Sequence, residues 1–521
     1  MDVRPTPMIP ASIGLVVDRE SIRPVNDAAA AHGNGAVNAA TTPSSSGRGR
    51  DGLSSVEDVA KYQDSARAWW VAIGASLATG MAFGTIYTFG AFMAAMSAEF
   101  GTGNGPTALM IGIATFLFFG TGILSGPLLH RVGPRPLLIA GGVLFFGGLA
   151  LTSAASAIWQ GYIFYGLGCG FGSGLFVAPL MATAAASFVR LRAISQGVVA
   201  SGPGLGTALL VPVAQWLIEN FGWRPSFRYL ALASLVVFAV CAVMVRPVPV
   251  SAHINPKAHV QRVLRTKAFR HLAVGAVLFS IPLIGSLAMV IRFATADGID
   301  AFAAGRLVSA IGFSSIVGRL LLTSVARAVG SVRLMKFAYG TLPVAYAIWL
   351  FAGDRYWQLM TFALVLGFAY GGFVALMGDV TAHLFGVVGI GSVMGVMFIF
   401  FGAGALIGPT TMGYLSEYAG GSTIPIAVVT VVALAGALSM LPMPRDPVPL
   451  PPPTEPFEPS APRNGLPEAP VTAQAAVGVT PSAHRPRRAL PADLVPPSVW
   501  RPIPATAEGA YRSRIGAPAK A

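Results

Sequence analysis

Arg319 is a charged residue deep inside a long apolar segment, residues 304–325. It precedes Arg327, at the end of that segment, by eight residues, which in a helix is roughly 12 Å. That depth is near the middle of a hydrocarbon layer about 30 Å thick. A buried guanidinium is costly without an anionic partner, yet the apolar segments hold no Asp or Glu except Asp379 at an edge. Because its planar fork suits a carboxylate, we predict that Arg319 binds a ligand carboxylate; an arginine held by backbone carbonyls is the alternative.

Four uncharged polar residues complete the predicted ligand contacts. The hydroxyls of Tyr87 and Tyr370 can donate hydrogen bonds to a ligand, although tyrosine in a membrane protein also packs between helices or lies at the interface. Ser315 lies one turn before Arg319 on the same helix face, and Ser201 lies in a glycine-rich helix. We predict that all four contact the substrate.

Composition identifies the elements that must position these residues. Of the 521 residues, 54% are hydrophobic and only 11% are charged, whereas soluble domains average roughly 25% charged residues. The 61 glycines fit membrane helices, which use small residues to pack closely. These values exclude a water-soluble enzyme and indicate an integral protein of the lipid bilayer.

Apolar segments long enough to cross a bilayer, about 20 residues each, recur twelve times along the chain. They cover approximately 69–92, 107–128, 137–157, 161–184, 195–217, 226–245, 272–292, 304–325, 335–352, 358–378, 390–412 and 423–442. The predicted fold class is therefore an all-α membrane protein with twelve transmembrane helices.

The connections between these segments predict orientation and domains. If residues 1–68 are cytosolic, the connections on the same side carry most of the loop Lys and Arg, so the positive-inside rule places both termini in the cytosol. The longest of these connections, 246–271, divides the chain into six-helix halves at 69–245 and 272–442. The Pro-rich residues 443–521, like 1–68, cannot bury enough apolar surface to order, so both tails are predicted to be disordered.

Weak self-similarity supports two duplicated halves. Residues 204–212 begin Gly-Leu-Gly-Thr-Ala-Leu, and residues 402–409 begin Gly-Ala-Gly-Ala-Leu, six helices later. Such internal repeats mark secondary transporters. Gly80 and Gly84 form a small-xxx-small pair that predicts close helix packing rather than ligand contact.

A loop in the first half resembles the inner-loop signature of the major facilitator superfamily, Gly-x-x-x-Asp-Arg-x-Gly-x-Arg. Its residues here are Gly126, His130, Arg131, Gly133 and Arg135. The resemblance implies two six-helix halves and a charge relay that latches one closed state. His130 stands where the acidic residue is usual, which puts that relay in doubt.

Further stretches are similar to the monocarboxylate and oxalate/formate transporter group. They are residues 290–299, the pair Gly318-Arg319, and residues 87–92. The resemblance implies that small organic carboxylates pass by alternating access, with Arg319 as the carboxylate anchor.

Three positions depart from that group. Ser315 stands where animal monocarboxylate carriers have an acid, and Tyr87 stands where they have a lysine. Phe401 aligns with the second cation of oxalate/formate exchangers. A dicarboxylate that needs two cations is therefore disfavoured, and co-transport of a proton stays open.

The sequence thus predicts secondary active or facilitated transport of a small organic anion, most simply a monocarboxylate. One alternative is a transporter-like membrane sensor that signals through its tails; another is a proton-coupled drug exporter, which would need a membrane-buried acid. We expect no enzyme activity, no cofactor and no metal, because no nucleophile–base pair, nucleotide loop or metal-ligand spacing occurs. We also expect a monomer in a bacterial inner membrane that binds no nucleic acid.

Overall fold

A computed structural model of the chain describes residues 63–245, 256–386 and 390–449. Most of the two predicted tails, residues 1–62 and 450–521, lies outside the described residues. Within the described ranges the chain forms helices and no strands. The predicted all-helical fold is confirmed.

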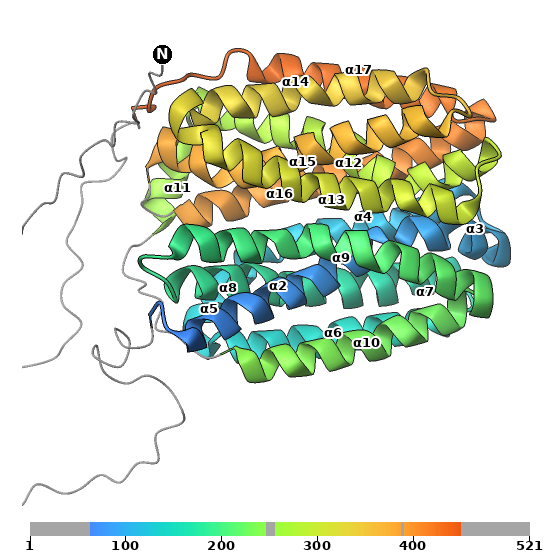
Figure 1. The fold of residues 1–521 in the computed structure, drawn as a ribbon, viewed down its shortest axis with the longest axis horizontal. Coiled ribbons are helices and arrows are strands. Elements are labelled where there is room, and N and C mark those ends of the chain that lie inside the picture. The colour runs from blue at the N-terminus through green and yellow to red at the C-terminus, as the bar shows by residue number, and fades with distance from the viewer. Residues whose placement is uncertain (1–62, 246–255, 387–389, 450–521) are drawn as a thin grey trace, which may run out of the picture. The chain divides into compact units, whose positions relative to one another are not determined.

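The helices follow one another with short connections (Figure 1). Their bounds are α2 (Ala66–Tyr87), α3 (Phe89–Phe100), α4 (Asn104–Gly120), α5 (Gly122–Val132), α6 (Pro134–Ser153), α7 (Ile158–Gly161), the π-helix η1 (Tyr162–Phe171), α8 (Gly172–Ala186), α9 (Arg192–Phe221), α10 (Trp223–Met244), α11 (Pro256–Leu264), α12 (Lys267–Ala296), α13 (Ala301–Val329), α14 (Ser331–Leu350), α15 (Tyr356–Phe385), α16 (Ile390–Ala419) and α17 (Thr423–Met440).

Each predicted apolar segment coincides with one helix or with a broken helix. Ten segments of the described chain are long and apolar enough to cross a membrane, and eleven are if α4 and α5, bent by 46°, form one span. The bend lies at Thr121, whose hydroxyl bonds the carbonyl of Leu117 at 2.6 Å, a known cause of helix bending. The remaining predicted segment, 335–352, is the ninth along the chain and corresponds to α14, where Arg333 and Lys336 lower the apolar character.

The helices extend past the predicted apolar boundaries. α15 continues from the predicted end at 378 to Phe385, because helical hydrogen bonds do not require apolar side chains. α12 begins at Lys267, inside the predicted linker, where the hydroxyl of Thr266 accepts a hydrogen bond from the Phe269 N–H at 3.2 Å. The linker also contains the short helix α11.

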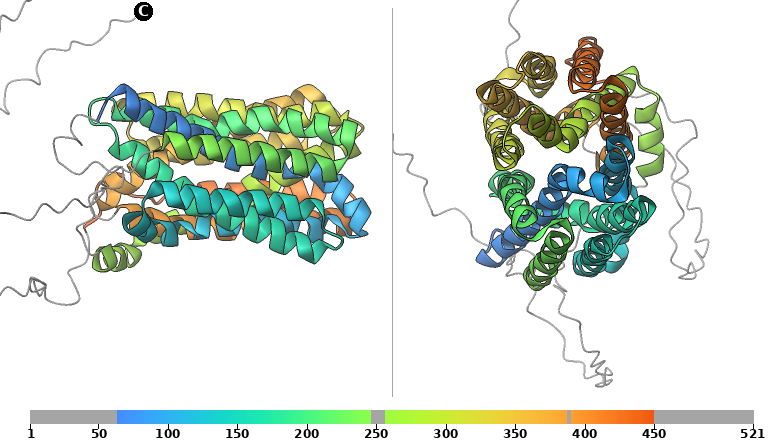
Figure 2. Two further views of the ribbon diagram at one scale, coloured as in Figure 1. Left: turned by 90° about the horizontal axis from the view of Figure 1, so that it is seen from below. Right: turned by 90° about the vertical axis from the view of Figure 1, so that its right-hand side faces the viewer.

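The helices gather into two groups, α2 to α10 and α12 to α17 (Figure 2). The groups meet along two pairs of helices, α4 with α16 and α9 with α13. We call the end of this bundle that carries Arg131, Arg190 and Arg327 the basic end. The opposite end, which carries Glu99 and Glu417, is called the Glu99 end.

Asp64, ahead of α2, ties the start of the first group to the basic end. Its carboxylate accepts hydrogen bonds from the backbone N–H groups of Arg190 at 2.9 Å and Leu191 at 3.1 Å. The Arg190 N–H is the main reason that the pKa of Asp64 lies below its ordinary value. This contact therefore stabilises the fold above the ordinary aspartate pKa and is lost only as the pH falls toward the lower folded-state value.

The sequence places residues 443–449 in the disordered C-terminal tail, but the structure packs them across the basic end of the second group. The N–H of Val448 donates to the carbonyl of Leu384 at 3.0 Å. Lys336 Nζ donates to the carbonyl of Met443 at 2.9 Å. These contacts hold residues 443–449 against α14 and α15.

Glycines let α2 and α9 pack at backbone distance. A Cβ atom at Gly206 would lie 1.9 Å from the carbonyl oxygen of Gly80. A Cβ at Gly84 would lie 2.6 Å from the same stretch of α9, at Gly206. The predicted packing role of Gly80 and Gly84 is confirmed.

This close approach can be tested with Gly206→Val. The branched side chain meets the backbone of α2, so the two helices must separate. Overpacking of this kind costs about 1–3 kcal/mol, and we expect a lower melting temperature for the purified protein in detergent. Gly147→Val is the matched control, because no neighbouring atom lies within 4 Å of a Cβ there. Equal melting temperatures for the two variants would contradict this packing.

Candidate functional site

A cavity of about 900 Å³ lies between the two groups of helices. Its lining reaches the basic end through Gln196, Arg327 and Asp379, and it ends inside the bundle at Arg319 and Tyr370. The cavity is therefore open toward the basic end and closed toward the Glu99 end.

Arg319 stands at the closed end of this cavity. Its side chain projects from α13 and is 5% exposed. One guanidinium N–H, at Nη1, donates to the carbonyl of Ala200 on α9, and the Tyr370 side chain is a further hydrogen-bonding neighbour of the guanidinium. Nε and Nη2 are buried and make no well-formed hydrogen bond among the described residues. A backbone carbonyl, the predicted alternative to a ligand, thus pairs with one of the three guanidinium nitrogens. Two buried donors remain unpaired, which is costly.

Two tyrosines extend the site from Arg319. The guanidinium carbon lies 5.6 Å from the ring centre of Tyr370 on α15, close enough for a cation–π contact. The Tyr370 hydroxyl lies 3.2 Å from that of Tyr87 on α2, so the pair joins the two groups. Tyr370 lines the cavity; Tyr87 is fully buried behind it. The structure thus brings Arg319, Tyr370 and Tyr87 together.

The two predicted serines occupy different places. Ser201 lines the cavity, and its hydroxyl bonds the carbonyl of Val198 at 2.7 Å. Ser315 is fully buried where α13 packs against α15. A Cβ atom at Gly371 on α15 would lie 1.9 Å from the backbone oxygen of Ser315. Its hydroxyl bonds Gly312 at 2.7 Å. Ser315 supports the helix that holds Arg319 but does not line the cavity.

Sequence reasoning did not find the phenylalanines that form much of the cavity wall. They are Phe83, Phe118, Phe119, Phe373, Phe398 and Phe401. The sequence drew attention only to Phe401, because it aligns with the second cation of oxalate/formate exchangers. In a membrane helix an apolar residue can face lipid or a cavity equally well, so no sequence signal distinguishes these rings.

The loop signature of the first half forms the turn between α5 and α6 at the basic end. His130, Arg131 and Arg135 are exposed there, and Gly126 is half-buried on α5. Gly133 joins the helices with a φ of 84°, which favours glycine. The corresponding Gly330 of the second half has a φ of 95°, so the two halves share this turn.

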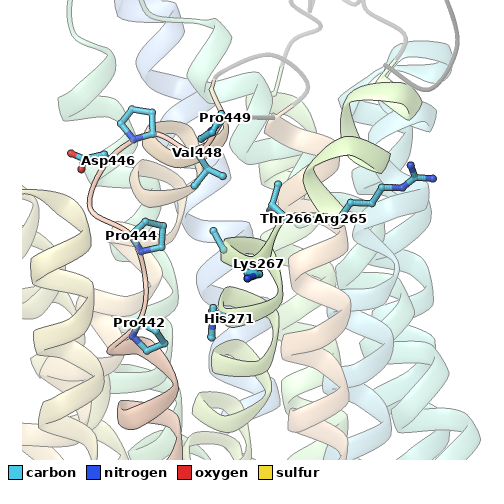
Figure 3. Close-up of a pocket in the computed structure, with 11 residues that line it drawn as sticks. Arg265, Thr266, Lys267, His271, Pro442, Pro444, Asp446, Val448 and Pro449 are labelled. Atoms are coloured by element: carbon cyan, nitrogen blue, oxygen red, sulfur yellow. The ribbon is translucent and has the colours of Figure 1, made fainter. Parts of the chain in front are cut away.

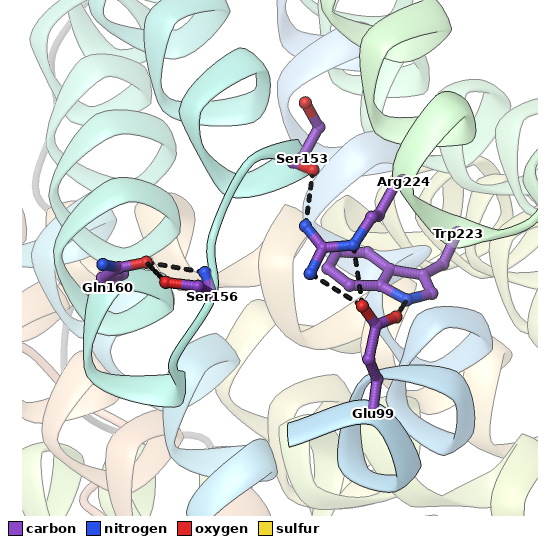
Figure 4. Close-up of polar contacts among 6 residues, drawn as sticks. All are labelled: Glu99, Ser153, Ser156, Gln160, Trp223 and Arg224. Atoms are coloured by element: carbon purple, nitrogen blue, oxygen red, sulfur yellow. Dashed lines mark hydrogen bonds and ion pairs between the residues drawn. The ribbon is translucent and has the colours of Figure 1, made fainter.

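At the Glu99 end, one polar network holds the first group together (Figure 4). Glu99 on α3 forms an ion pair of 2.7 Å with Arg224 on α10 and accepts a hydrogen bond from the Trp223 indole. Arg224 also donates to the carbonyl of Ser153 at 2.9 Å. This network ties α3, α6 and α10 into one unit.

A second contact at this end joins the two groups. Gly103, the N-cap of α4, has no side chain to cap the helix. The carboxylate of Glu417 on α16 lies where that side chain would be, 1.9 Å from an ideal Cβ, and accepts the Gly105 N–H at 3.2 Å. A carboxylate at a helix N-terminus is stabilising, so Glu417 acts as an N-cap from the opposite half.

Another hollow, of about 870 Å³, lies at the basic end (Figure 3). Lys267 and His271 of α12 form one wall, and Pro442, Pro444 and Val448 of the C-terminal segment form the other. It shares no residue with the central cavity. Among the described residues no three His, Cys, Asp or Glu side chains gather into a metal site.

Two groups of membrane-spanning helices around a cavity open at one end define a membrane transporter. The sequence profile of the Major Facilitator Superfamily matches residues 75–355 and 340–503. The chain belongs to the Major Facilitator Superfamily.

Curated relatives and solved structures agree with this family. Monocarboxylate transporter 3 of Rattus norvegicus is 28% identical over 67% of this chain and 74% of its own length. Monocarboxylate transporter 13 of Bos taurus is 26% identical over 74% of this chain and 91% of its own. The fold is similar to a bacterial homologue of the human lysosomal transporter Spinster in an inward-facing, unoccupied conformation, with a TM-score of 0.59, 13% identity, and coverage of 72% of this chain and 97% of that one.

The Glu417 contact predicts a shift in conformation when it is removed. Spin labels at Ala98→Cys and Tyr418→Cys, in a protein without Cys169 and Cys241, report the separation of the halves at the Glu99 end. Loss of a charge at a helix N-terminus is worth about 0.3–1 kcal/mol. We therefore expect Glu417→Ala to raise the long-distance population roughly two- to fivefold.

Glu219→Ala is the matched control for this experiment. That carboxylate lies at the same end but accepts a hydrogen bond from Gln215 of its own helix at 3.0 Å. An unchanged distance distribution in Glu417→Ala, or the same change in both variants, would rule out the cross-half cap.

Proposed function

We propose that this transporter carries a small organic monocarboxylate by alternating access, with Arg319 as the carboxylate anchor. The observation that carries the proposal is the buried Arg319 in the lining at the closed end of the cavity, whose Nε and Nη2 make no well-formed hydrogen bond among the described residues. Both nitrogens are covered in this conformation, so the proposal requires the neighbouring side chains to move aside for the ligand. A carboxylate can accept hydrogen bonds from both nitrogens. Binding then offsets the cost of two buried donors, because the substrate supplies the hydrogen-bond acceptors that the protein does not.

A single negative charge fits the site better than two. Arg319 is the buried cation of the described cavity lining, and the other arginine there, Arg327, is exposed at the mouth. Phe401 lines the cavity at the position that aligns with a second cation. The names of the relatives, monocarboxylate transporters 3 and 13, favour the same class.

Orientation follows from the loop charges. Because Lys and Arg concentrate at the basic end, we place that end in the cytosol, so the described conformation is open to the inside. To reach the outward-open state, the bundle must close over Arg327 and separate Glu417 from α4. Tyr87 and Tyr370 lie between these two regions, where the halves rock against each other.

Neither alternative gains support from the cavity. A proton-coupled drug exporter needs an acid deep in the membrane, and the only carboxylate of the described cavity lining, Asp379, is exposed at the mouth. A sensor that signals through its tails would depend on residues outside the described ranges. We therefore propose transport and neither alternative. Whether protons are co-transported can be measured by imposing a pH gradient during uptake.

Arg319→Gln tests the anchor in proteoliposomes with labelled monocarboxylates from acetate to 3-phenylpropionate. Charge-assisted hydrogen bonds contribute about 1.5–3 kcal/mol, so we expect uptake at low substrate to fall at least about tenfold. Arg319→Lys should not restore it, because a point charge lacks the planar fork.

Arg306→Gln is the control, because this arginine is exposed on the same helix, α13, near its start. Its uptake should match that of the unaltered protein. Undiminished uptake in Arg319→Gln would refute the anchor.

A further inference from the structure

The central cavity is much larger than a short-chain acid requires. Its volume of about 900 Å³ lies in the range of about 300–1,000 Å³ that encloses drug-sized ligands. An acetate or propionate held on Arg319 would leave most of this space to water. The cavity therefore has room for a ligand with a large body attached to its carboxylate.

The anchor and the aromatic wall lie on opposite sides of this space. Arg319 belongs to the pair α9 and α13, whereas Phe119 and Phe401 belong to the pair α4 and α16. The end-on view in Figure 2 places the two helix pairs on opposite sides of the bundle interior. A ligand bound at Arg319 thus projects its other end toward the phenyl rings.

The rings of that wall form one continuous apolar cluster around Phe119, in which Phe119 and Phe398 are partly exposed and the other rings are buried behind them. Its ring centre lies 4.8 Å from that of Phe401, 5.7 Å from that of Phe398 and 4.7 Å from that of Phe118. Phe373 stacks on Phe401 at 5.6 Å. Rings at these separations accept a further ring by edge-to-face or offset contact.

Hydroxyl groups on the lining are already used within their own helices. Ser201 bonds Val198, and Thr79 bonds Ser76 at 3.0 Å. Thr323 likewise bonds the carbonyl of Arg319 at 2.6 Å. These hydroxyls have no hydrogen left to donate to a ligand, although each can still accept one, and the Gln196 amide nitrogen, near the mouth, has no partner among the described residues. Beside Arg319 the phenyl wall is the largest feature of the lining, so we take apolar contact with it as the main interaction of the ligand body.

We infer that the ligand is a monocarboxylate that carries an apolar ring, and that Phe119 and Phe401 set this specificity. The inference rests on the proposed function, because it takes Arg319 as the carboxylate anchor. The carboxylate binds at the closed end between α9 and α13, and the ring packs against the wall between α4 and α16.

Binding by the purified full chain in detergent tests the inference with matched probes. 3-Phenylpropionate and propionate share the carboxylate and differ by the ring. Burial of about 100 Å² of apolar surface predicts roughly 50-fold tighter binding of 3-phenylpropionate. Its amide and phenethylammonium, which lack the negative charge, should bind at least about tenfold more weakly.

The aromatic wall is tested with Phe119→Ala and Phe401→Leu. Each should lower the ratio of 3-phenylpropionate affinity to propionate affinity at least about fivefold, and residual binding of propionate shows that the variant is folded. Phe400→Ala is the control beside Phe401, because that side chain is 37% exposed on the outer face of α16. It should bind both acids as the unaltered protein does.

The outcomes separate the two proposals. If propionate binds as tightly as 3-phenylpropionate, and Arg319→Gln weakens both, the ring specificity is wrong and the carboxylate anchor stands. If neither acid binds, or if the amide or the ammonium binds better than the acid, the proposed function itself fails. A preference for the ring that survives both Phe119→Ala and Phe401→Leu would also overturn the assigned wall.

Discussion

The fold keeps a guanidinium inside a bundle that has too little hydrogen-bonding capacity for it. Hydrocarbon cannot solvate a charge, and the described helices supply Arg319 with the Ala200 carbonyl and with the ring and hydroxyl of Tyr370. Two nitrogens stay unpaired at the inner end of a cavity that opens toward the basic end. In the proposal, an anion that enters the cavity from the basic end offsets this cost.

Two kinds of contact allow such a cavity to exist. Glycines let helices of the two groups approach at backbone distance, as where a Cβ at Gly312 on α13 would lie 2.8 Å from the Gly204 carbonyl oxygen of α9. At the Glu99 end, Glu417 caps α4 across the halves and holds them together. Both contacts have backbone atoms on at least one side and do not interlock large side chains, so we expect them to separate and re-form without repacking a core. This is what rocking between two states requires.

Part of the site could be read from the sequence. Arg319 is a charge within an apolar segment, and its burial follows from its position alone. The packing of Gly80 and Gly84 follows from their spacing. Phe119 and Phe401 could not be recognised, because apolar side chains are equally at home against lipid and in a cavity. The Glu417 cap joins residues far apart in the chain, so no local pattern encodes it. The contact of Ser315 depends on α15, which the sequence could not place.

A single-particle cryo-EM structure of the full chain with 3-phenylpropionate tests the account most directly. We predict ligand density with its carboxylate within hydrogen-bond distance of Nε and Nη2 of Arg319. Ligand density remote from Arg319, or a guanidinium paired with a carboxylate of the protein itself, would contradict the central claim.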